Sequence, residues 1–441
     1  MDQNKSDSRY GFALLIIGCL FFIFGFITWA NSQLIPYLKI ACQLTDTQSF
    51  LVASAFFAAY FVMALPSSYV LERTGFKRGM SLGLVVMAIG ALLFIPAAGS
   101  RSYPLFLTGL FIQGTGLALL QTATNPYVTI LGPIASAARR MSIMGICNKL
   151  AGIIAVYVLG GIALKDADGL IERLKEMQAT EKAVELDALA TRVVIPYLVI
   201  AGVLILLAIL LLFMNLPEVK GADEVQAEKI NKPTTGEKGS VFQYPHLIMG
   251  ALAIFFYVGV EVISYDTFAT LGQTLGYKLD TARHFASFTG YGLLVGYLLS
   301  IATIPNVISQ RSALILAVLL SMVLVFLAVF LKGNAEVTYL FLFNQKMTIP
   351  THAAIWCFAL LGFTNSVMWP AIWPLALDGV GSYAKTGGAL LIMMIVGGAV
   401  LPPLYGKFSE WIGDYQLGCL IMIPCYLYIL FFAVKGSKIK S

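Results

Sequence analysis

Three charged side chains lie inside long apolar runs of the sequence. Lys149 stands in the run MSIMGICNKLAGIIAV, and Glu261 and Asp266 share the run FFYVGVEVISYD. A charge at the centre of a bilayer costs about 3 kcal/mol even on insertion-based scales, so such residues normally face a cavity and mark a route for ions or solutes. An unpaired ammonium in lipid is costly. We therefore expect Lys149 to have a carboxylate partner.

The two carboxylates are not expected to serve the same group. Glu261 and Asp266 are five residues apart, which separates them by about 140° around a helix of 3.6 residues per turn. Three possibilities stay open for Lys149. It forms a pair that is made and broken, a fixed pair that only holds two helices together, or no pair, with its ammonium reaching water.

Amide side chains form a second set of polar residues within the apolar runs: Asn31, Gln33, Gln113, Gln121, Asn125, Asn148 and Asn365. An amide both donates and accepts hydrogen bonds, which suits the hydroxyl groups of a sugar. Five aromatic residues are able to stack on a pyranose ring: Trp29, Trp369, Trp373, Tyr127 and Tyr265. Hydrogen bonds between helices explain any single amide equally well. The candidate sugar contacts are Asn31, Gln121, Asn125, Asn148, Asn365 and Trp369.

The composition shows what must position these residues. Of the 441 residues, 59% are hydrophobic and only 12% are charged, against about 25% charged in soluble proteins. A membrane span needs about 20 mostly apolar residues, and twelve such segments fit the sequence. They are 11–38, 47–71, 79–98, 103–131, 140–164, 191–215, 246–275, 284–305, 312–331, 351–377, 383–406 and 414–434. The fold class predicted is an all-α membrane protein of twelve transmembrane helices, with the lipid bilayer as its solvent.

The chain divides into two halves that resemble each other. We predict an N-terminal six-helix bundle over 1–215, a polar linker over 216–243 and a C-terminal six-helix bundle over 244–441. Setting Gly25 against Gly259 aligns the first helix with the seventh. Nearly the same offset pairs Arg78 with Arg311, and polar, proline-containing stretches interrupt the fourth and tenth helices at 121–126 and 365–370. Interrupted helices at corresponding positions of two repeats favour a binding site at their interface.

The basic residues predict the orientation. With a cytoplasmic N-terminus, the inner loops carry Arg73, Lys77, Arg78, Arg139, Arg140, Arg311 and Lys385, and the outer loops carry markedly fewer. Both termini are then cytoplasmic, in a bacterial-type inner membrane. The formal net charge of +6 is explained by this topology and indicates no nucleic-acid partner. The outer loop 165–190 spaces its apolar residues like a surface helix.

Motifs for metal binding and catalysis are missing from the sequence. The six cysteines form no C-x-x-C spacing, and the three histidines lie near span ends. There is no HExxH, no glycine-rich phosphate loop and no Ser-His-Asp candidate set. We therefore predict no catalytic residue, no metal and no cofactor.

The joint SSYVLERTGFKRG resembles the signature that major facilitators carry between their second and third helices. Ser68, Glu72 and Phe76 depart from that signature. The resemblance implies a charge latch between helix ends, formed by Glu72, Arg73 and Arg78, that stabilises one conformation without touching substrate.

Four further stretches carry a wider resemblance: AYFVMALPSSYVLERTGFKRG, LLQTATNPYVTILGP, SVMWPAIWPLAL and GGALLIMMIVGGAVLPPLYG. They are similar to the fucose, glucose/galactose and N-acetylglucosamine permeases, one family of sugar:cation symporters within the major facilitator superfamily. The resemblance covers nearly all of the chain outside the loops. It implies two pseudo-symmetric six-helix bundles.

The family's functional residues transfer unevenly. The fucose-permease pattern has carboxylates where this chain has Ser32 and Gln121, so both proton-carrying acids are missing. Gln121 and Glu261 agree with the glucose/galactose branch, and the family's helix-five asparagine is kept as Asn148. The run RMSIMGICNK, with Lys149 in place of a small residue, looks closest to the N-acetylglucosamine branch.

The resemblance implies a secondary transporter that imports a sugar by cation symport and alternating access. N-acetylglucosamine ranks first, neutral hexoses follow closely, and the coupling ion is a proton or sodium. Lys149, Glu261 and Asp266 are the expected coupling residues, and we expect a monomer. The alternatives are a sugar uniporter, a fucose-type proton symporter and, further off, a membrane sugar sensor.

Overall fold

The computed structural model describes residues 2–130, 137–214, 241–304, 307–342, 345–380 and 384–439. The predicted linker 216–243 lies outside the described residues except for its end, where Val241–Gln243 forms a 3-10 turn, η2. The boundaries of the two bundles therefore stay a prediction.

All regular elements in the described residues of the first half are helices, joined by short turns. Its elements are α1 Asp2–Ala41, α2 Asp46–Ser49, α3 Leu51–Leu92, α4 Phe94–Gly99, α5 Tyr103–Ile130, α6 Ala137–Ala163, α7 Ala167–Glu176, α8 Ala179–Thr191 and α9 Val194–Phe213. Two spans run together in α3 and bend at Gly75, whose φ of 70° and ψ of 171° suit a residue without a Cβ. This bend is the joint that the sequence marks by SSYVLERTGFKRG.

The second half has more interruptions. Its helices are α11 Pro245–Asp266, α12 Phe268–Thr274, α13 Leu279–Ala282, α14 Phe285–Thr303, α15 Gln310–Phe330, α16 Ala353–Asn365, α17 Met368–Leu377, α18 Ala384–Met393, α19 Gly397–Ile412, α20 Tyr415–Gly418 and α21 Met422–Val434. Short 3-10 turns η4, η5 and η6 cover Met394–Val396, Cys419–Ile421 and Gly436–Lys438. Strands β1 Val337–Leu342 and β2 Gln345–Pro350 form one antiparallel hairpin, with Val337 opposite Pro350.

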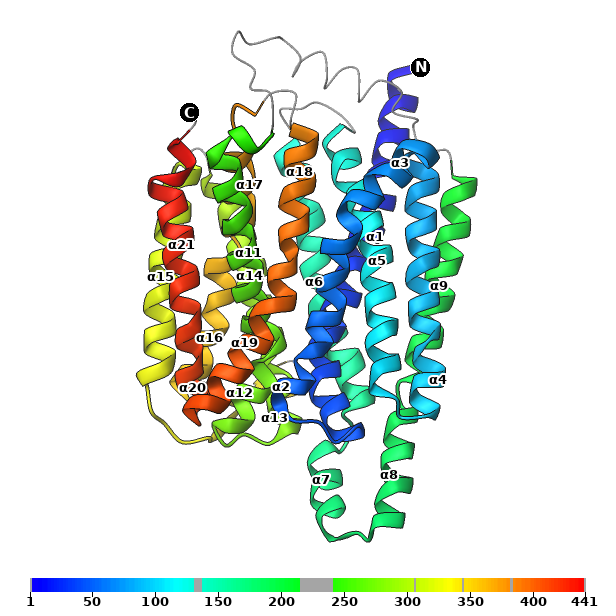
Figure 1. The fold of residues 1–441 in the computed structure, drawn as a ribbon, viewed down its shortest axis with the longest axis vertical. Coiled ribbons are helices and arrows are strands. Elements are labelled where there is room, and N and C mark those ends of the chain that lie inside the picture. Colours follow the sequence, from blue (N-terminus) through cyan, green and yellow to red (C-terminus); the bar gives the residue numbers. More distant parts are fainter. Residues whose placement is uncertain are drawn as a thin grey trace.

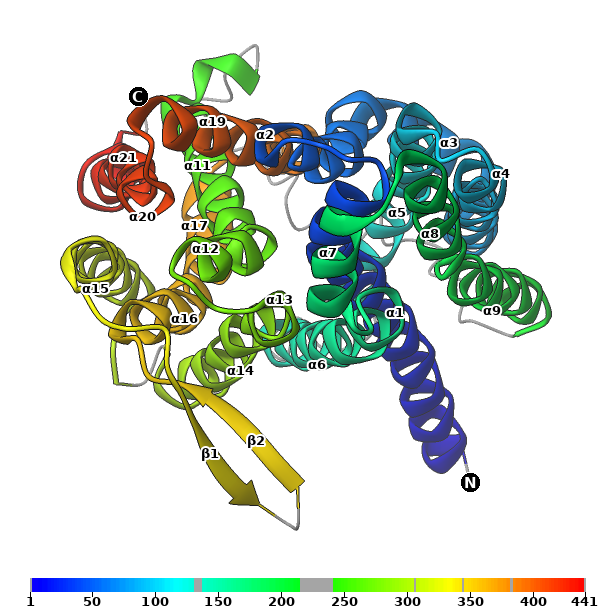
Figure 2. The same ribbon diagram turned by 90° about the horizontal axis from the view of Figure 1, so that it is seen from below.

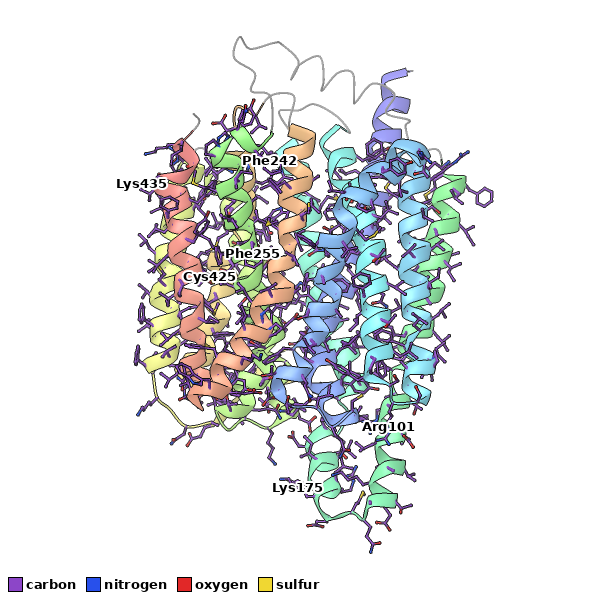
Figure 3. The ribbon with its side chains drawn as sticks, in the orientation of Figure 1. Arg101, Lys175, Phe242, Phe255, Cys425 and Lys435 are labelled. Carbon is purple, nitrogen blue, oxygen red and sulfur yellow. The ribbon has the colours of Figure 1, made fainter. Side chains whose placement is uncertain are left out.

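Within the described residues, twelve helical segments are long and apolar enough to cross a membrane, as the sequence predicted. They run roughly along one common axis, with both termini at one end of the bundle (Figure 1). Lys435 lies at the end of the bundle that carries the termini, and Lys175 and Arg101 lie toward the opposite end (Figure 3). Phe255 and Cys425 lie between the two ends, along the spans. Charge therefore sits at the two ends and apolar surface between them, as a bilayer requires.

The predicted surface helix of 165–190 is a pair of helices. Helices α7 and α8 extend beyond the rest of the bundle at the end opposite the termini (Figure 1). Leu170 and Leu174 of α7 are buried, while Glu172, Arg173, Lys175 and Glu176 of the same helix are exposed. This end of the molecule is referred to below as the α7–α8 face.

Glycines permit close helix packing at equivalent places in the two halves. A Cβ on Gly25 would lie 1.8 Å from the backbone oxygen of Asn148, so α1 rests directly on α6. A Cβ on Gly259 would lie 2.0 Å from Cδ1 of Leu401, so at this place α11 rests on a side chain of α19. These two glycines are the pair that aligned the halves in the sequence, and small residues of this kind are typical of tight helix packing in membranes.

Helices α3 and α6 of the first half make the most extensive contacts with the second half. Helix α6 packs against α14, and α3 packs against α18 and α19. Viewed from the α7–α8 face, the two halves lie on either side of these contacts, with α7 over the end of α1 and α13 beside α6 (Figure 2). Any residue that bridges α6 and the second half therefore lies at the boundary between the two halves.

Candidate functional site

A buried ion pair joins the two halves. Nζ of Lys149, on α6, lies 3.1 Å from Oε1 of Glu261, on α11. The side chains are only 12% and 11% exposed. The carboxylate partner expected for Lys149 is thus present, and it is Glu261 and not Asp266.

An aromatic stack lies beside this pair. Nζ of Lys149 is 5.5 Å from the ring centroid of Trp29, a cation–π distance, and the ring of Tyr265 stacks on Trp29 with centroids 4.6 Å apart. The indole occupies space left by two glycines: a Cβ on Gly152 would lie 2.6 Å from Trp29, and one on Gly290 would lie 3.1 Å from it. Trp29 of the first half therefore reaches α14 of the second.

Asp266, the second predicted carboxylate, has a different environment. It ends α11, its side chain is 0% exposed, and neither carboxylate oxygen has a hydrogen-bond partner among the described residues. An ionised carboxylate without partners in such a place is strongly disfavoured. The 140° separation read from the sequence thus corresponds to one paired and one unpaired acid.

The predicted amides do not all face the same region. Gln121 donates from Nε2 to the hydroxyl of Tyr60 at 2.9 Å, and Asn148 donates to the carbonyl oxygen of Phe21 at 3.3 Å. Both side chains keep part of their surface exposed. The side chains of Asn31 and Asn125 lie outside the described residues.

Asn365 has the environment of a residue that joins helices. It is 0% exposed and accepts a hydrogen bond of 3.0 Å from the hydroxyl of Tyr426, on α21. This arrangement favours the interhelical role over the sugar contact for Asn365. Trp369 instead lies near α11, the helix that carries Glu261, with its ring centroid 6.2 Å from that of Tyr257 on α11. It also contacts Trp373, at 5.3 Å between centroids.

The predicted charge latch at the α3 bend is described only in part. The side chain of Glu72 lies outside the described residues. The guanidinium of Arg73 lies 4.2 Å from the ring centroid of Tyr69, and Arg78 is exposed. The latch stays a prediction.

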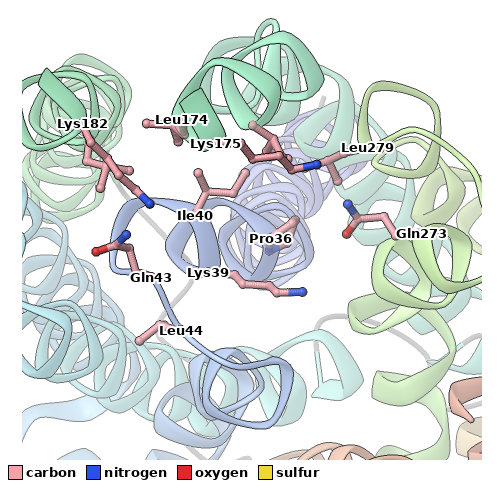
Figure 4. Close-up of a pocket in the computed structure, with 12 residues that line it drawn as sticks. Pro36, Lys39, Ile40, Gln43, Leu44, Leu174, Lys175, Lys182, Gln273 and Leu279 are labelled. Carbon is pink, nitrogen blue, oxygen red and sulfur yellow. The ribbon is translucent and has the colours of Figure 1, made fainter. Parts of the chain in front are cut away.

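A pocket of about 380 Å³ lies at the α7–α8 face, away from the candidate site. Its lining includes Lys39, Lys175 and Lys182 of the first half around Pro36 and Ile40, with Gln273 and Leu279 of the second half across from them (Figure 4). Lys39 is paired with Asp46. These lysines were not singled out from the sequence, because their spacing gives no indication that they share a pocket with residues of the other half.

Comparison with known proteins gives a consistent result. The model of the Major Facilitator Superfamily matches residues 17–402. A glucose/galactose transporter of Brucella abortus biovar 1 (strain 9-941) is 37% identical over 99% of this chain and 97% of its own length. The L-fucose-proton symporter of Escherichia coli (strain K12) is 27% identical over 99% of this chain and 96% of its own.

A solved structure agrees with these relatives. FucP, a major facilitator transporter in the outward conformation, superimposes with a TM-score of 0.71 at 26% identity, covering 96% of this chain and 98% of that one. The twelve spans, the two bundles and the full-length relatives lead to the same assignment: the chain belongs to the major facilitator superfamily.

Proposed function

We propose that this protein imports a glucose- or galactose-like hexose together with a proton. The observation that carries the mechanism is the buried Lys149–Glu261 pair, because it joins the two halves across the boundary that must open and close. The sugar class is supported by full-length relatives named as glucose/galactose transporters, at 33% to 37% identity.

The sugar contacts proposed are Gln121, Asn148 and Trp369, with Asn31 on α1 and Asn125 on α5 as further candidates. Gln121 and Asn148 come from α5 and α6, and Trp369 comes from the broken helix pair α16–α17 of the other half. Partly exposed amides and an indole are side chains that suit a ring that carries hydroxyl groups. The names of the relatives favour a neutral hexose, while N-acetylglucosamine, ranked first from the run RMSIMGICNK, remains a prediction to test beside it.

The proton site proposed is on α11. The position that carries an acid in the fucose-permease pattern is Ser32, whose hydroxyl donates to the carbonyl oxygen of Trp29 at 2.8 Å. Glu261 and Asp266 are then the acids left within the spans. Asp266 is fully buried and neither of its carboxylate oxygens has a hydrogen-bond partner among the described residues, an environment that disfavours the ionised form. Glu261 is available to take a proton when Lys149 leaves it.

A proton as coupling ion is supported by relatives named as proton symporters. The proposed orientation has both termini in the cytoplasm and the α7–α8 face outside an inner membrane, in line with the distribution of lysine and arginine. The proposed working unit is a monomer.

Transport by the purified protein in vesicles tests the proposal. Labelled glucose, galactose, N-acetylglucosamine and fucose are compared with a proton gradient, a sodium gradient or neither. We expect glucose or galactose to accumulate with the proton gradient alone. Equal uptake of glucose with and without either gradient would establish a uniporter, and accumulation of fucose alone would overturn the hexose assignment.

A further inference from the structure

A carboxylate of the first half caps backbone groups of the second. The side chain of Asp168, on α7, accepts hydrogen bonds from the N–H groups of Leu279 and Asp280, each at 2.8 Å. These N–H groups open α13, and the first N–H groups of a helix have no partner inside it. A carboxylate that accepts two of them forms two charge-assisted bonds.

A guanidinium of the second half does the converse. Nη1 of Arg283, between α13 and α14, donates to the carbonyl oxygens of Gly160 at 2.6 Å and Leu164 at 2.9 Å. Gly160 lies in the last turn of α6 and Leu164 directly follows that helix, at the helix end that carries negative partial charge. The backbone oxygen of Arg283 in turn accepts from Nε2 of Gln33 at 2.9 Å.

Both contacts cross from one half to the other at the α7–α8 face, within five residues of the second half. The halves thus exchange complementary charges with each other's helix ends: a carboxylate on N–H groups in one direction and a guanidinium on carbonyls in the other. Since both contacts share the short segment 279–283, separation of the halves at this face must break them together.

The rest of this face continues the closure. The hydroxyl of Ser287, on α14, donates to the hydroxyl of Tyr157, on α6, at 3.3 Å. His284 stacks on Tyr157 with ring centroids 5.1 Å apart. Ser287 is fully buried beneath these contacts. The lysine-lined pocket is lined by residues of both halves. Separation of the halves would therefore widen it.

We propose that Asp168 and Arg283 form a clamp that holds the α7–α8 face closed and sets the balance between the two conformations of the transporter. The proposal rests on alternating access by the proposed transporter. It does not depend on which sugar or ion is transported, or on the orientation in the membrane. Breaking the clamp shifts the protein toward the conformation that is open at this face.

The test measures access to a buried thiol at this face. Ser287→Cys places a thiol under the clamp, and its labelling by a membrane-impermeant maleimide is followed in purified protein in detergent or nanodiscs, without sugar or gradient. The parent without the new cysteine gives the background from the native thiols. Melting temperature is measured for each variant.

We expect Asp168→Ala or Arg283→Ala to speed labelling of the new thiol about fivefold or more, the effect of losing one ordinary hydrogen bond or more. Asp168→Asn, which keeps one accepting oxygen, should give an intermediate rate. The matched control is Arg173→Ala. It breaks an ion pair of 3.1 Å with Asp166 at the edge of the same helix, but within one half, and labelling should stay at the parent rate.

Unchanged labelling in Asp168→Ala and Arg283→Ala, with melting temperatures near the parent's, would overturn the clamp. Equal acceleration by Arg173→Ala would overturn it too, because general loosening of α7 would then explain the result. Faster labelling in a protein that moves no hexose in vesicles would keep the clamp and reject the proposed substrate. Hexose uptake with unchanged labelling would do the reverse.

Discussion

Two of the contacts between the halves of this protein differ in what they can respond to. In the membrane interior, Lys149 and Glu261 pair one ionisable side chain with another, each almost fully buried. At the α7–α8 face, Asp168 and Arg283 bind backbone N–H and carbonyl groups. The interior pair has a partner that can be neutralised by a proton, while the backbone partners of the clamp never change charge.

The difference suggests a division of roles. A pair whose strength depends on protonation can couple ion binding to movement, because adding a proton to Glu261 removes the attraction for Lys149. Contacts to helix ends give a fixed bias that movement must overcome. Each prediction below tests one side of this division.

The largest effect is expected from Lys149→Ala. Removing one partner of a buried pair leaves an uncompensated charge, which costs about 3 to 5 kcal/mol. If the pair forms and breaks, net uptake should stop while sugar counterflow partly persists, since exchange does not need the empty carrier to reorient.

The control for this variant separates a switch from a staple. If the lysine only holds helices together, Lys149→Ala should lower the melting temperature, and adding Glu261→Gln should restore it. Wild-type net uptake in the single variant would exclude the switching role. Melting temperature and counterflow of the two single variants and the double variant decide.

The next effect concerns the proton. Asp266→Asn imitates the neutral acid, so the variant should still fold and still catalyse sugar counterflow. It should lose the contribution of Asp266 to proton uptake. Combined with Glu261→Gln, it should abolish accumulation entirely. A pH-sensitive dye inside vesicles measures proton entry with the sugar. Accumulation that survives the double change would exclude both acids as the coupling site.

A smaller effect is expected from Gly290→Ala, which acts on closure without any charge. The new Cβ would lie 2.7 Å from Cγ1 of Ile153 and 3.1 Å from Trp29, both across the boundary between halves. Such overpacking typically costs about 1 to 3 kcal/mol, and here it should favour opening at the α7–α8 face.

The matched control for that glycine is Gly161→Ala, where a Cβ would meet nothing within 4 Å. Labelling of the Ser287→Cys thiol should rise in Gly290→Ala and stay unchanged in Gly161→Ala. Equal labelling in both would mean that the two halves are not in close contact at Trp29.

The smallest effect is expected from Gln121→Ala. Loss of one hydrogen bond to a sugar hydroxyl is worth about 1 kcal/mol, or roughly fivefold in affinity. Asn365→Ala should instead leave affinity unchanged and reduce stability, because Asn365 bonds to Tyr426. Binding calorimetry and melting temperature distinguish the two, and unchanged affinity in Gln121→Ala would remove it from the sugar site.

Much of the fold could be predicted from the sequence because lipid imposes a simple rule. Apolar runs of about 20 residues must be spans, and twelve were found where twelve were predicted. Charge balance also predicted a partner for Lys149 on the seventh helix. Helix periodicity alone predicted that Glu261 and Asp266 face different directions and do not serve the same group.

The site was harder to predict, because composition does not tell which way a side chain points. Asn365 looked like Gln121 in the sequence, yet it is buried against another helix. Asp168 and Arg283 were missed for a different reason. Charges near span ends were interpreted as topology signals, and their partners are backbone groups, which no residue type reveals.

The contact of α1 with α6 at Gly25 has a mechanical consequence. Because the two backbones touch without intervening side chains, that part of the first half has little compressible material and should deform poorly. The second half has a comparable backbone contact where a Cβ on Gly397 of α19 would lie 1.9 Å from the backbone oxygen of Phe255 on α11. However, α11 ends at Asp266 and α12 begins only at Phe268. Elastic compliance should therefore concentrate at Thr267, next to the unpartnered acid, and a change of charge at Asp266 would act where the structure bends most easily.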